Sequence, residues 1–205
     1  MNKFFVFGYG SLINKKSLQS TLPDAKIIAP VLLKNYERSW NAAPEVVSFA
    51  TTFLGLLKRD DKITNGVIFE VTEEMLSDLD KREFIYDRVE LDQKDFVFLS
   101  SNIIFSNHDK IYTYITKKPI IASQNHPIIQ SYVDICLEGC LQIEADFGIE
   151  NFARDFILQT NCWSKFWVND RLFPRAPKRN VPKAYEIDQL LFDNVYKFFK
   201  EITIE

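Results

Sequence analysis

The sequence predicts an α+β protein with a small mixed, β-barrel-like sheet, flanking helices and a helical C-terminal extension. Three observations lead to this class. The first half of the chain contains short β-branched and aromatic runs separated by turn residues. The second half is dominated by apolar residues at helical spacing. Strands and helices do not alternate, so the parallel sheet of a βαβ protein is not expected.

The composition is typical of one globular domain. The chain has 205 residues, 46% of them hydrophobic, which is enough to bury a core in a single domain spanning 1–205. We expect residues 1–120 to form the core that carries the site, and residues 121–205 to form a mainly helical part packed on it. The formal net charge of -3 argues against a nucleic-acid partner, which needs a basic face.

Three cysteines, an odd number, do not indicate a disulfide framework, and we expect reduced thiols and a cytoplasmic location. The N-terminal apolar run ends at Gly8 and is too short for a signal sequence. No apolar stretch approaches the length of a membrane span, so no membrane partner is expected. The sequence leaves the oligomeric state open.

The first half is predicted to consist mainly of strands. Lys3–Phe7 reads as a strand that feeds a tight glycine turn. Pro30 suits an edge or a bend, and Lys58–Asn65 reads as a polar turn between two strands. The further predicted strands are Ile27–Trp40, Ser48–Leu57, Gly66–Val71, Tyr86–Leu91, Asp95–Leu99 and Ile111–Ile115. In the last of these, Tyr112 and Tyr114 share one face, because side chains alternate along a strand.

A short helix is predicted after Thr72. This hydroxyl is an N-cap, and Glu73 and Glu74 follow in the first turn, where the helix dipole favours acids. Later helices are predicted from Pro127 to before Gly148, at Glu150–Thr160 and at Ile187–Lys200. The turn Asn169-Asp170-Arg171 is interpreted as structural, with Arg171 paired to Asp170.

Cys136 and Cys140 are four residues apart on the apolar stripe of a predicted helix. A metal site would need more ligands nearby, and buried cysteines on such a stripe are far commoner, so we expect core residues and no metal.

The loop Gly8–Leu12 is the first candidate site. It is not a dinucleotide-binding fingerprint, because Ile13 stands where the third glycine is needed. It is not a P-loop, because Lys15 replaces that motif's second glycine. Two glycines flanking Tyr9 can instead turn successive N–H groups toward one spot and form a nest for an anion or oxyanion. An ordinary tight turn is the structural alternative, and Ser11 lacks the context of a nucleophile.

Glu83 is the second candidate. It follows the predicted short helix and precedes Phe84, in a segment dense in charge but flanked by apolar residues. Desolvation between aromatic side chains can raise the pKa of a carboxyl, which suits it to proton transfer near neutral pH. The alternative is a solvated face on which the neighbouring arginines and acids pair with one another.

Taken together, the two segments resemble the γ-glutamylcyclotransferase-like superfamily, which includes the ChaC-type glutathione-degrading enzymes. The family pattern is a strand, a loop such as Tyr9–Leu12, and a glutamate reached through a short helix, as in Arg82-Glu83. Pro127–Cys140 and Trp163–Pro177 also look like a bacterial subgroup of this superfamily. The resemblance therefore covers most of the chain.

The resemblance implies a γ-glutamylcyclotransferase-like fold and conversion of a small-molecule γ-glutamyl peptide or amine to 5-oxoproline plus free amine. Glu83 would act as general acid/base, and neither metal nor organic cofactor is implied. Arg38 lies where the family often carries a Gly-aromatic-x-Arg segment, with Asn35 in place of that glycine. The residues expected to bind substrate are Phe7, Gly8, Tyr9, Gly10, Ser11, Leu12, Tyr114, with Tyr112 as its alternative, and Arg38.

Two other classes of function remain open from the sequence. A non-catalytic barrel could bind a small carboxylate or a protein partner. A nucleotide-binding protein could use the glycine loop with the lysines that follow it. The leaving amine of the predicted reaction is not indicated by the sequence.

Overall fold

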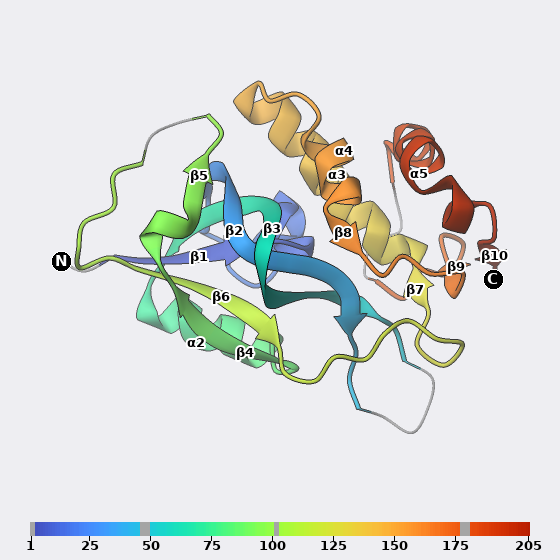
Figure 1. Ribbon diagram of the computed structural model, residues 1–205, viewed down its shortest axis with the longest axis horizontal. Helices are drawn as coiled ribbons and strands as arrows, with labels where there is room; N and C mark the ends of the chain where they lie inside the picture. Colours follow the sequence, from blue (N-terminus) through green and yellow to red (C-terminus); the bar gives the residue numbers. More distant parts are fainter. Residues whose placement is uncertain (1–2, 46–49, 101–102, 177–180) are drawn as a thin grey trace.

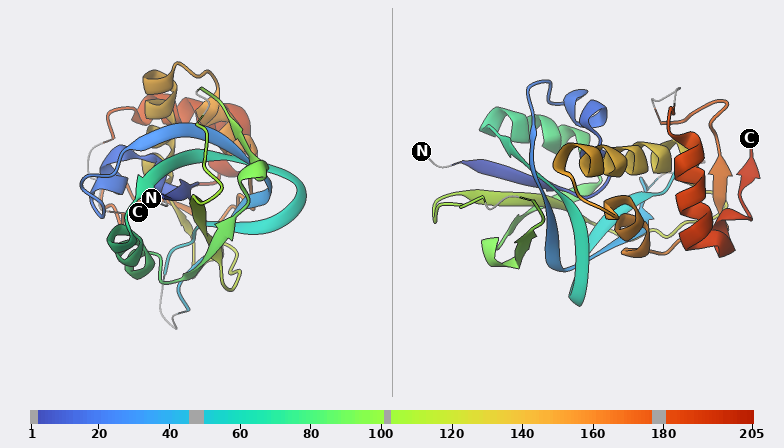
Figure 2. Two further views of the ribbon diagram at one scale, coloured as in Figure 1. Left: turned by 90° about the vertical axis from the view of Figure 1, so that its left-hand side faces the viewer. Right: turned by 90° about the horizontal axis from the view of Figure 1, so that it is seen from above.

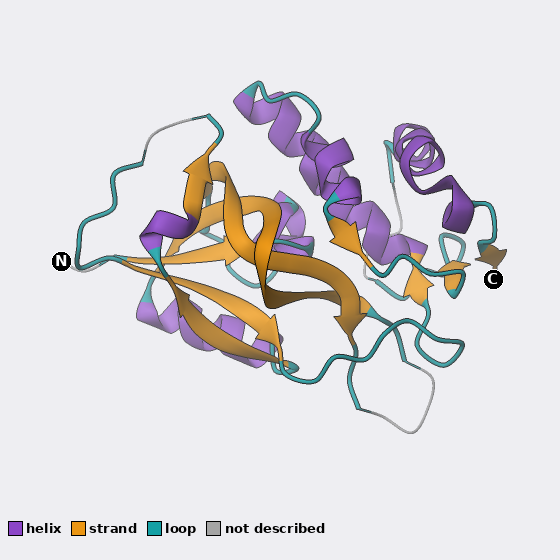
Figure 3. Ribbon diagram, viewed as in Figure 1, coloured by secondary structure: helices purple, strands orange, loops and turns teal. Residues whose placement is uncertain are grey.

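A computed structural model describes residues 3–45, 50–100, 103–176 and 181–205. Its main sheet has seven strands, in the order β4-β6-β1-β3-β2-β5, with β8 paired to β2 (Figures 1 and 3). The strands of this sheet are β1 (Phe4–Gly8), β2 (Ile27–Ala42), β3 (Phe53–Val71), β4 (Tyr86–Leu91), β5 (Phe96–Phe98), β6 (Lys110–Thr116) and β8 (Thr160–Asn161).

The sheet is mixed, as predicted, but it does not close into a barrel. β1 pairs antiparallel with β3 and parallel with β6, and β2 pairs antiparallel with β3. The end strands β4 and β5 pair with β6 and β2, and among the described residues they do not pair with each other. Closure requires these edges to meet. Figure 2 shows β2 and β3 curving together, which gives the sheet its barrel-like bend without closure.

The predicted turn Lys58–Asn65 is wrong, because β3 is one continuous strand. Both of its halves pair with β2, with Lys58 opposite Tyr36 and Ile63 opposite Lys34. The residues between them bulge outward, so the polar segment reaches solvent without reversing the chain. Opposite this bulge, Asn35 has φ 61°, a left-handed conformation that asparagine tolerates better than most residues.

Most of the helical residues lie in the second half of the chain. They are the 3-10 turns η1 (Ser11–Ile13) and η2 (Gln93–Asp95), and the helices α1 (Lys15–Gln19), α2 (Glu73–Arg82), α3 (Gln130–Phe147), α4 (Phe152–Leu158) and α5 (Ala184–Phe199). The predicted N-cap of α2 is confirmed, because the Thr72 hydroxyl accepts a hydrogen bond from the backbone N–H of Met75. None of the described helices is long and apolar enough to cross a bilayer.

The start of α3 differs from the prediction. Pro127 lies outside the helix, because Ile128 and Ile129 form the short strand β7. This strand belongs to a second sheet with β9 (Trp167–Asn169) and β10 (Thr203–Ile204). The predicted end of α3 is confirmed, since Gly148 follows with φ 64° as a left-handed C-cap.

Helix α3 packs directly on the loop that follows β1. A Cβ added to Gly139 would lie 2.6 Å from the backbone nitrogen of Asn14, so only glycine permits this approach. The Asn14 amide also donates to the Glu138 carboxylate at 2.8 Å. The helical part of the chain therefore helps to fix the position of the glycine loop.

The turn after β9 is structural, but its pairing differs from the prediction. Arg171 donates to Asp134 on α3 and to Asp188 on α5, rather than to Asp170. Asp170 is buried and accepts hydrogen bonds from the backbone and hydroxyl of Ser131. Arg171 thus links the turn after β9 to α3 and to α5 through ion pairs. A pair between Arg171 and its neighbour Asp170 would not make this connection.

Candidate active site

The glycine loop ends β1 and leads directly into η1. The first hydrogen bond of η1 runs from the Ile13 N–H to the Gly10 carbonyl at 3.0 Å. The N–H groups of Ser11 and Leu12 precede this bond, so they have no partner within the turn. Gly10, Ser11 and Leu12 all line a small cavity. The loop therefore has two N–H groups without a partner in η1 at residues that line the cavity, and the anion nest stays a prediction.

Glu83 lines the same cavity as the loop. It is the C-terminal cap of α2, where its N–H donates to the Leu79 carbonyl at 2.8 Å. Its side chain is only 16% exposed, although the neighbouring Phe84 is 67% exposed. The end of α2 thus turns Glu83 inward. A solvated charged face, the alternative reading of this segment, does not describe Glu83.

Arg82 connects the end of α2 to the glycine loop. Its Nε lies 3.1 Å from the Glu83 carboxylate. One terminal nitrogen donates to the Ser17 carbonyl and the Thr21 hydroxyl, and the other donates to the hydroxyls of Ser11 and Ser17. The two terminal nitrogens thus form four hydrogen bonds, and Nε forms the ion pair with Glu83. Arg82 therefore holds the carboxyl group beside the loop, and the protein engages both of its terminal nitrogens.

Two cavities meet at this point. The smaller cavity has a volume of about 30 Å³ and is lined by the loop residues. The larger cavity has a volume of about 780 Å³. Four residues line both cavities: Ser11, Glu83, Tyr86 and Tyr132. A ligand with its reacting group near Glu83 could therefore place one end against the loop and extend its other end into the larger space.

Burial sets the protonation of the groups around these cavities. Desolvation raises the pKa of Glu83 above its usual range, and the Arg82 guanidinium offsets part of that increase. Desolvation also raises the pKa of Tyr9, Tyr86 and Tyr132 well above the usual tyrosine value, so their hydroxyls remain protonated. Among the groups with a shifted pKa that line the small cavity, Glu83 is therefore the one whose pKa is displaced toward neutral pH.

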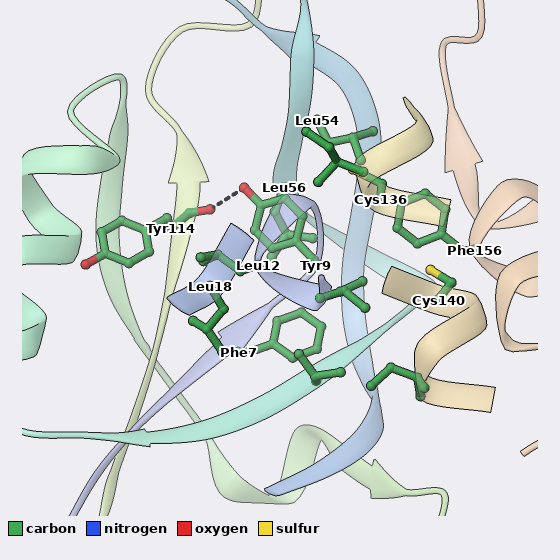
Figure 4. Close-up of a cluster of buried hydrophobic side chains, with 14 of the residues drawn as sticks. Phe7, Tyr9, Leu12, Leu18, Leu54, Leu56, Tyr114, Cys136, Cys140 and Phe156 are labelled. Atoms are coloured by element: carbon green, nitrogen blue, oxygen red, sulfur yellow. Dashed lines mark hydrogen bonds between the residues drawn. The ribbon is translucent and has the colours of Figure 1, made fainter. Parts of the chain in front are cut away.

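Two of the predicted binding tyrosines are tied to each other. The Tyr9 hydroxyl donates to the Tyr114 carbonyl at 2.7 Å, as Figure 4 shows. The Tyr114 hydroxyl donates to Asp80 on α2 at 2.9 Å. Both residues line the small cavity, but these bonds engage both hydroxyls with the protein. Their contribution at the cavity is therefore shape and packing.

The remaining predicted residues divide into two groups. Phe7 lines the small cavity, whereas Gly8 and Tyr112 do not. Gly8 lies against β3, where its carbonyl is 2.5 Å from the position of a Cβ added to Gly66. Tyr112 shares a face of β6 with Tyr114 but packs on Phe4, away from the cavity.

Arg38 is not placed to bind substrate, and the structure corrects that prediction. It is fully buried and does not line either cavity. Its five N–H donors go to the hydroxyl of Thr160, to the carbonyls of Tyr9 and Phe156, and to the carbonyl and side-chain oxygens of Asn65. Its guanidinium also lies 3.7 Å from the centre of the Phe156 ring. Arg38 therefore joins the glycine loop to β3 and α4.

Sequence reasoning missed Tyr86 and Tyr132. Tyr86 donates to the Leu54 carbonyl at 2.8 Å, and the Tyr132 hydroxyl is 3.0 Å from the position of a Cβ added to Gly10. Tyr86 stands three residues after Glu83, a signal that could have suggested it. Tyr132 comes from the helical C-terminal part, so nothing near the loop in sequence pointed to it.

Cys136 and Cys140 are both buried in the core, as Figure 4 shows, and burial raises the pKa of Cys136 to about 12. No cluster of three or more histidine, cysteine or acidic residues able to hold a metal ion occurs in the described ranges.

The buried carboxyl makes a prediction about stability. A raised pKa in the folded state means that the contribution of Glu83 to stability is present below the ordinary value of 4.5 and is lost as pH rises through the raised value. We expect the free energy of unfolding of the wild type, minus that of Glu83→Gln, to fall as the pH rises above 4.5. Denaturant titrations of both proteins measure this difference. A constant or rising difference contradicts the prediction.

The open mixed sheet with helices on it has a γ-glutamylcyclotransferase-like fold. A solved structure named gamma-glutamyl cyclotransferase matches with a TM-score of 0.56 and 13% identity, over 94% of this chain and 99% of that chain. The crystal structure of uncharacterized protein loc79017 from Homo sapiens matches with the same TM-score and identity, over 93% and 99%. At this identity the likeness shows the fold. No family model matches the sequence, and the search of curated proteins found no match.

Proposed function

We propose that this protein is a γ-glutamylcyclotransferase, which converts a γ-glutamyl compound to 5-oxoproline and a free amine. The observation that carries the proposal is that Glu83 and the glycine loop line one cavity, although they are some seventy residues apart in the sequence. The names of structures with the same fold and the raised pKa of Glu83 support it. The odd cysteine count supports a cytoplasmic location as part of the same proposal.

The reaction we propose is intramolecular. The α-amine of the substrate attacks its own γ-carbonyl carbon, forming a new C–N bond, and Glu83 accepts a proton from that amine. The original C–N bond then breaks as Glu83 returns the proton to the leaving nitrogen. The products are the five-membered lactam 5-oxoproline and the amine, with no net change in protons or electrons.

The loop contributes to the same proposal by stabilising negative charge. The N–H groups of Ser11 and Leu12 have no partner within η1, so they can donate to the developing oxyanion or to the substrate's α-carboxylate. The buried side chains of Tyr86 and Tyr132 line the space in which the substrate must fold back on itself. Because the attack is within one molecule, positioning supplies a large part of the acceleration.

The test is an assay for 5-oxoproline. We expect release of 5-oxoproline and free amine, in equal amounts, when the purified protein is incubated with a panel of γ-glutamyl peptides and γ-glutamylamines. Chromatographic detection of both products distinguishes cyclisation from hydrolysis, which yields glutamate. Ligand binding without either product would indicate a non-catalytic binding protein and would overturn the proposal.

A further inference from the structure

The larger cavity extends beyond Glu83, on the side where the leaving amine of the proposed reaction must lie. We place the γ-glutamyl end of a substrate where the two cavities meet, beside Ser11 and Glu83, because the small cavity alone has room only for a water-sized group. The volume of about 780 Å³ is within the range of pockets that enclose drug-sized ligands. The larger cavity can therefore hold a leaving group far bigger than a simple amine. This inference rests on the proposed function.

The walls of the larger cavity differ in chemistry. One wall is apolar and is built by Phe53, Ile129 and Ile135. A second, polar part of the lining comes from α1 and its flanks, which supply Lys16, Ser17 and neighbouring hydroxyl side chains. A ligand with both an apolar body and a polar end would be complementary to these two walls.

The charges that line the larger cavity are mainly positive. They belong to Lys16, Arg82, Glu83 and Arg175. Arg82 is engaged by its ion pair with Glu83 and by four hydrogen bonds, and Arg175 pairs with Glu205. Lys16 forms no ion pair with any residue in the described parts of the chain. The ammonium of Lys16 is therefore the cation on this wall best placed to meet a ligand.

We propose that Lys16 is a specificity-determining residue, which selects substrates whose leaving amine carries a carboxylate and a large apolar group. The apolar group packs on Phe53 and Ile129, and the carboxylate pairs with the Lys16 ammonium. γ-Glutamyl derivatives of large apolar amino acids can make both contacts, the apolar one and the ion pair. γ-Glutamyl monoamines can make the apolar contact, but they have no carboxylate to pair with Lys16.

The experiment compares two ligands that differ by a single carboxylate, γ-glutamyl-phenylalanine and γ-glutamyl-phenethylamine. Their Kd values are measured by calorimetry on Glu83→Gln, so that no turnover occurs. We expect roughly tenfold tighter binding of the phenylalanine compound, which corresponds to one charge-assisted contact. The preference should decrease as salt is raised, because the Lys16 side chain is exposed. γ-Glutamyl-alanine should bind more weakly than the phenylalanine compound.

Two lysine variants in the Glu83→Gln background identify the cation responsible. Lys16→Gln should bring the ratio of the two Kd values near one. Lys15→Gln is the matched control, because it removes the same charge from the same turn of α1, does not line the cavity, and pairs with Asp146. We expect it to keep the ratio.

The outcomes separate this inference from the proposed function. A ratio near one before Lys16 is changed, a ratio that survives Lys16→Gln, or no binding of any of the three compounds overturns the inference. A Lys16-dependent ratio supports it even where the wild type forms no 5-oxoproline, a result that overturns only the proposed function. Formation of 5-oxoproline by the wild type with equal preference for both compounds overturns only the inference.

Discussion

Glu83→Gln should reduce the rate of 5-oxoproline formation by roughly 10² to 10⁴-fold, the usual contribution of a general acid/base. Glutamine has nearly the same shape as glutamate but cannot accept and return a proton in this pH range. The small cavity should keep its form, because the remaining donors of Arg82 still bond to Ser11, Ser17 and Thr21. Steady-state assays of kcat and KM on the best γ-glutamyl substrate measure the loss. We expect it mainly in kcat.

A second carboxylate on the same helix provides the control. Glu74 lies in the first turn of α2, is exposed, and does not line either cavity. Glu74→Gln makes the same chemical change and should keep wild-type activity. Circular dichroism and the unfolding midpoint establish that Glu83→Gln is folded. Activity of folded Glu83→Gln within a factor of a few of the wild type would remove Glu83 from the mechanism.

Arg38→Ala should lower the free energy of unfolding by about 3 kcal/mol or more, the largest stability effect we predict. Arg38 is fully buried, and its loss leaves a void and buried oxygens without their donors, among them the Tyr9 carbonyl and the side-chain oxygen of Asn65. Burial lowers the pKa of Arg38 to about 10, so it remains charged at neutral pH and its hydrogen bonds are charge-assisted. Denaturant titration measures the change.

Arg88→Ala is the matched control for this effect. Arg88 pairs with Asp80 at 2.8 Å, and both side chains are partly exposed, so the pair contributes at most about 1 kcal/mol. Arg38→Lys should recover only part of the lost stability, because an ammonium cannot reach acceptors in a planar fork. Equal stability losses in Arg38→Ala and Arg88→Ala would contradict the structural role assigned to Arg38.

Much of the fold could be predicted from local signals. The strand before the glycine loop, the N-cap at Thr72 and the left-handed cap at Gly148 depend on a few neighbouring residues, and all three are present in the structure. The predicted turn at Lys58–Asn65 failed because polar composition does not reveal whether both flanking segments pair with the same strand. The mixed, barrel-like sheet was predicted, but local signals did not reveal that it stays open, since edge pairing depends on how far the whole sheet curves.

The sequence by itself determined the α+β class, the glycine loop and the acid at the end of a short helix, because caps, turns and alternation act over a few residues. Only the tertiary structure decided that Glu83 faces inward, that Arg82 fixes it beside Ser11, and that Arg38 is structural. It also brought Tyr132 on α3 to the site. Those outcomes depend on desolvation and on contacts between distant segments, which exist only after the chain has folded.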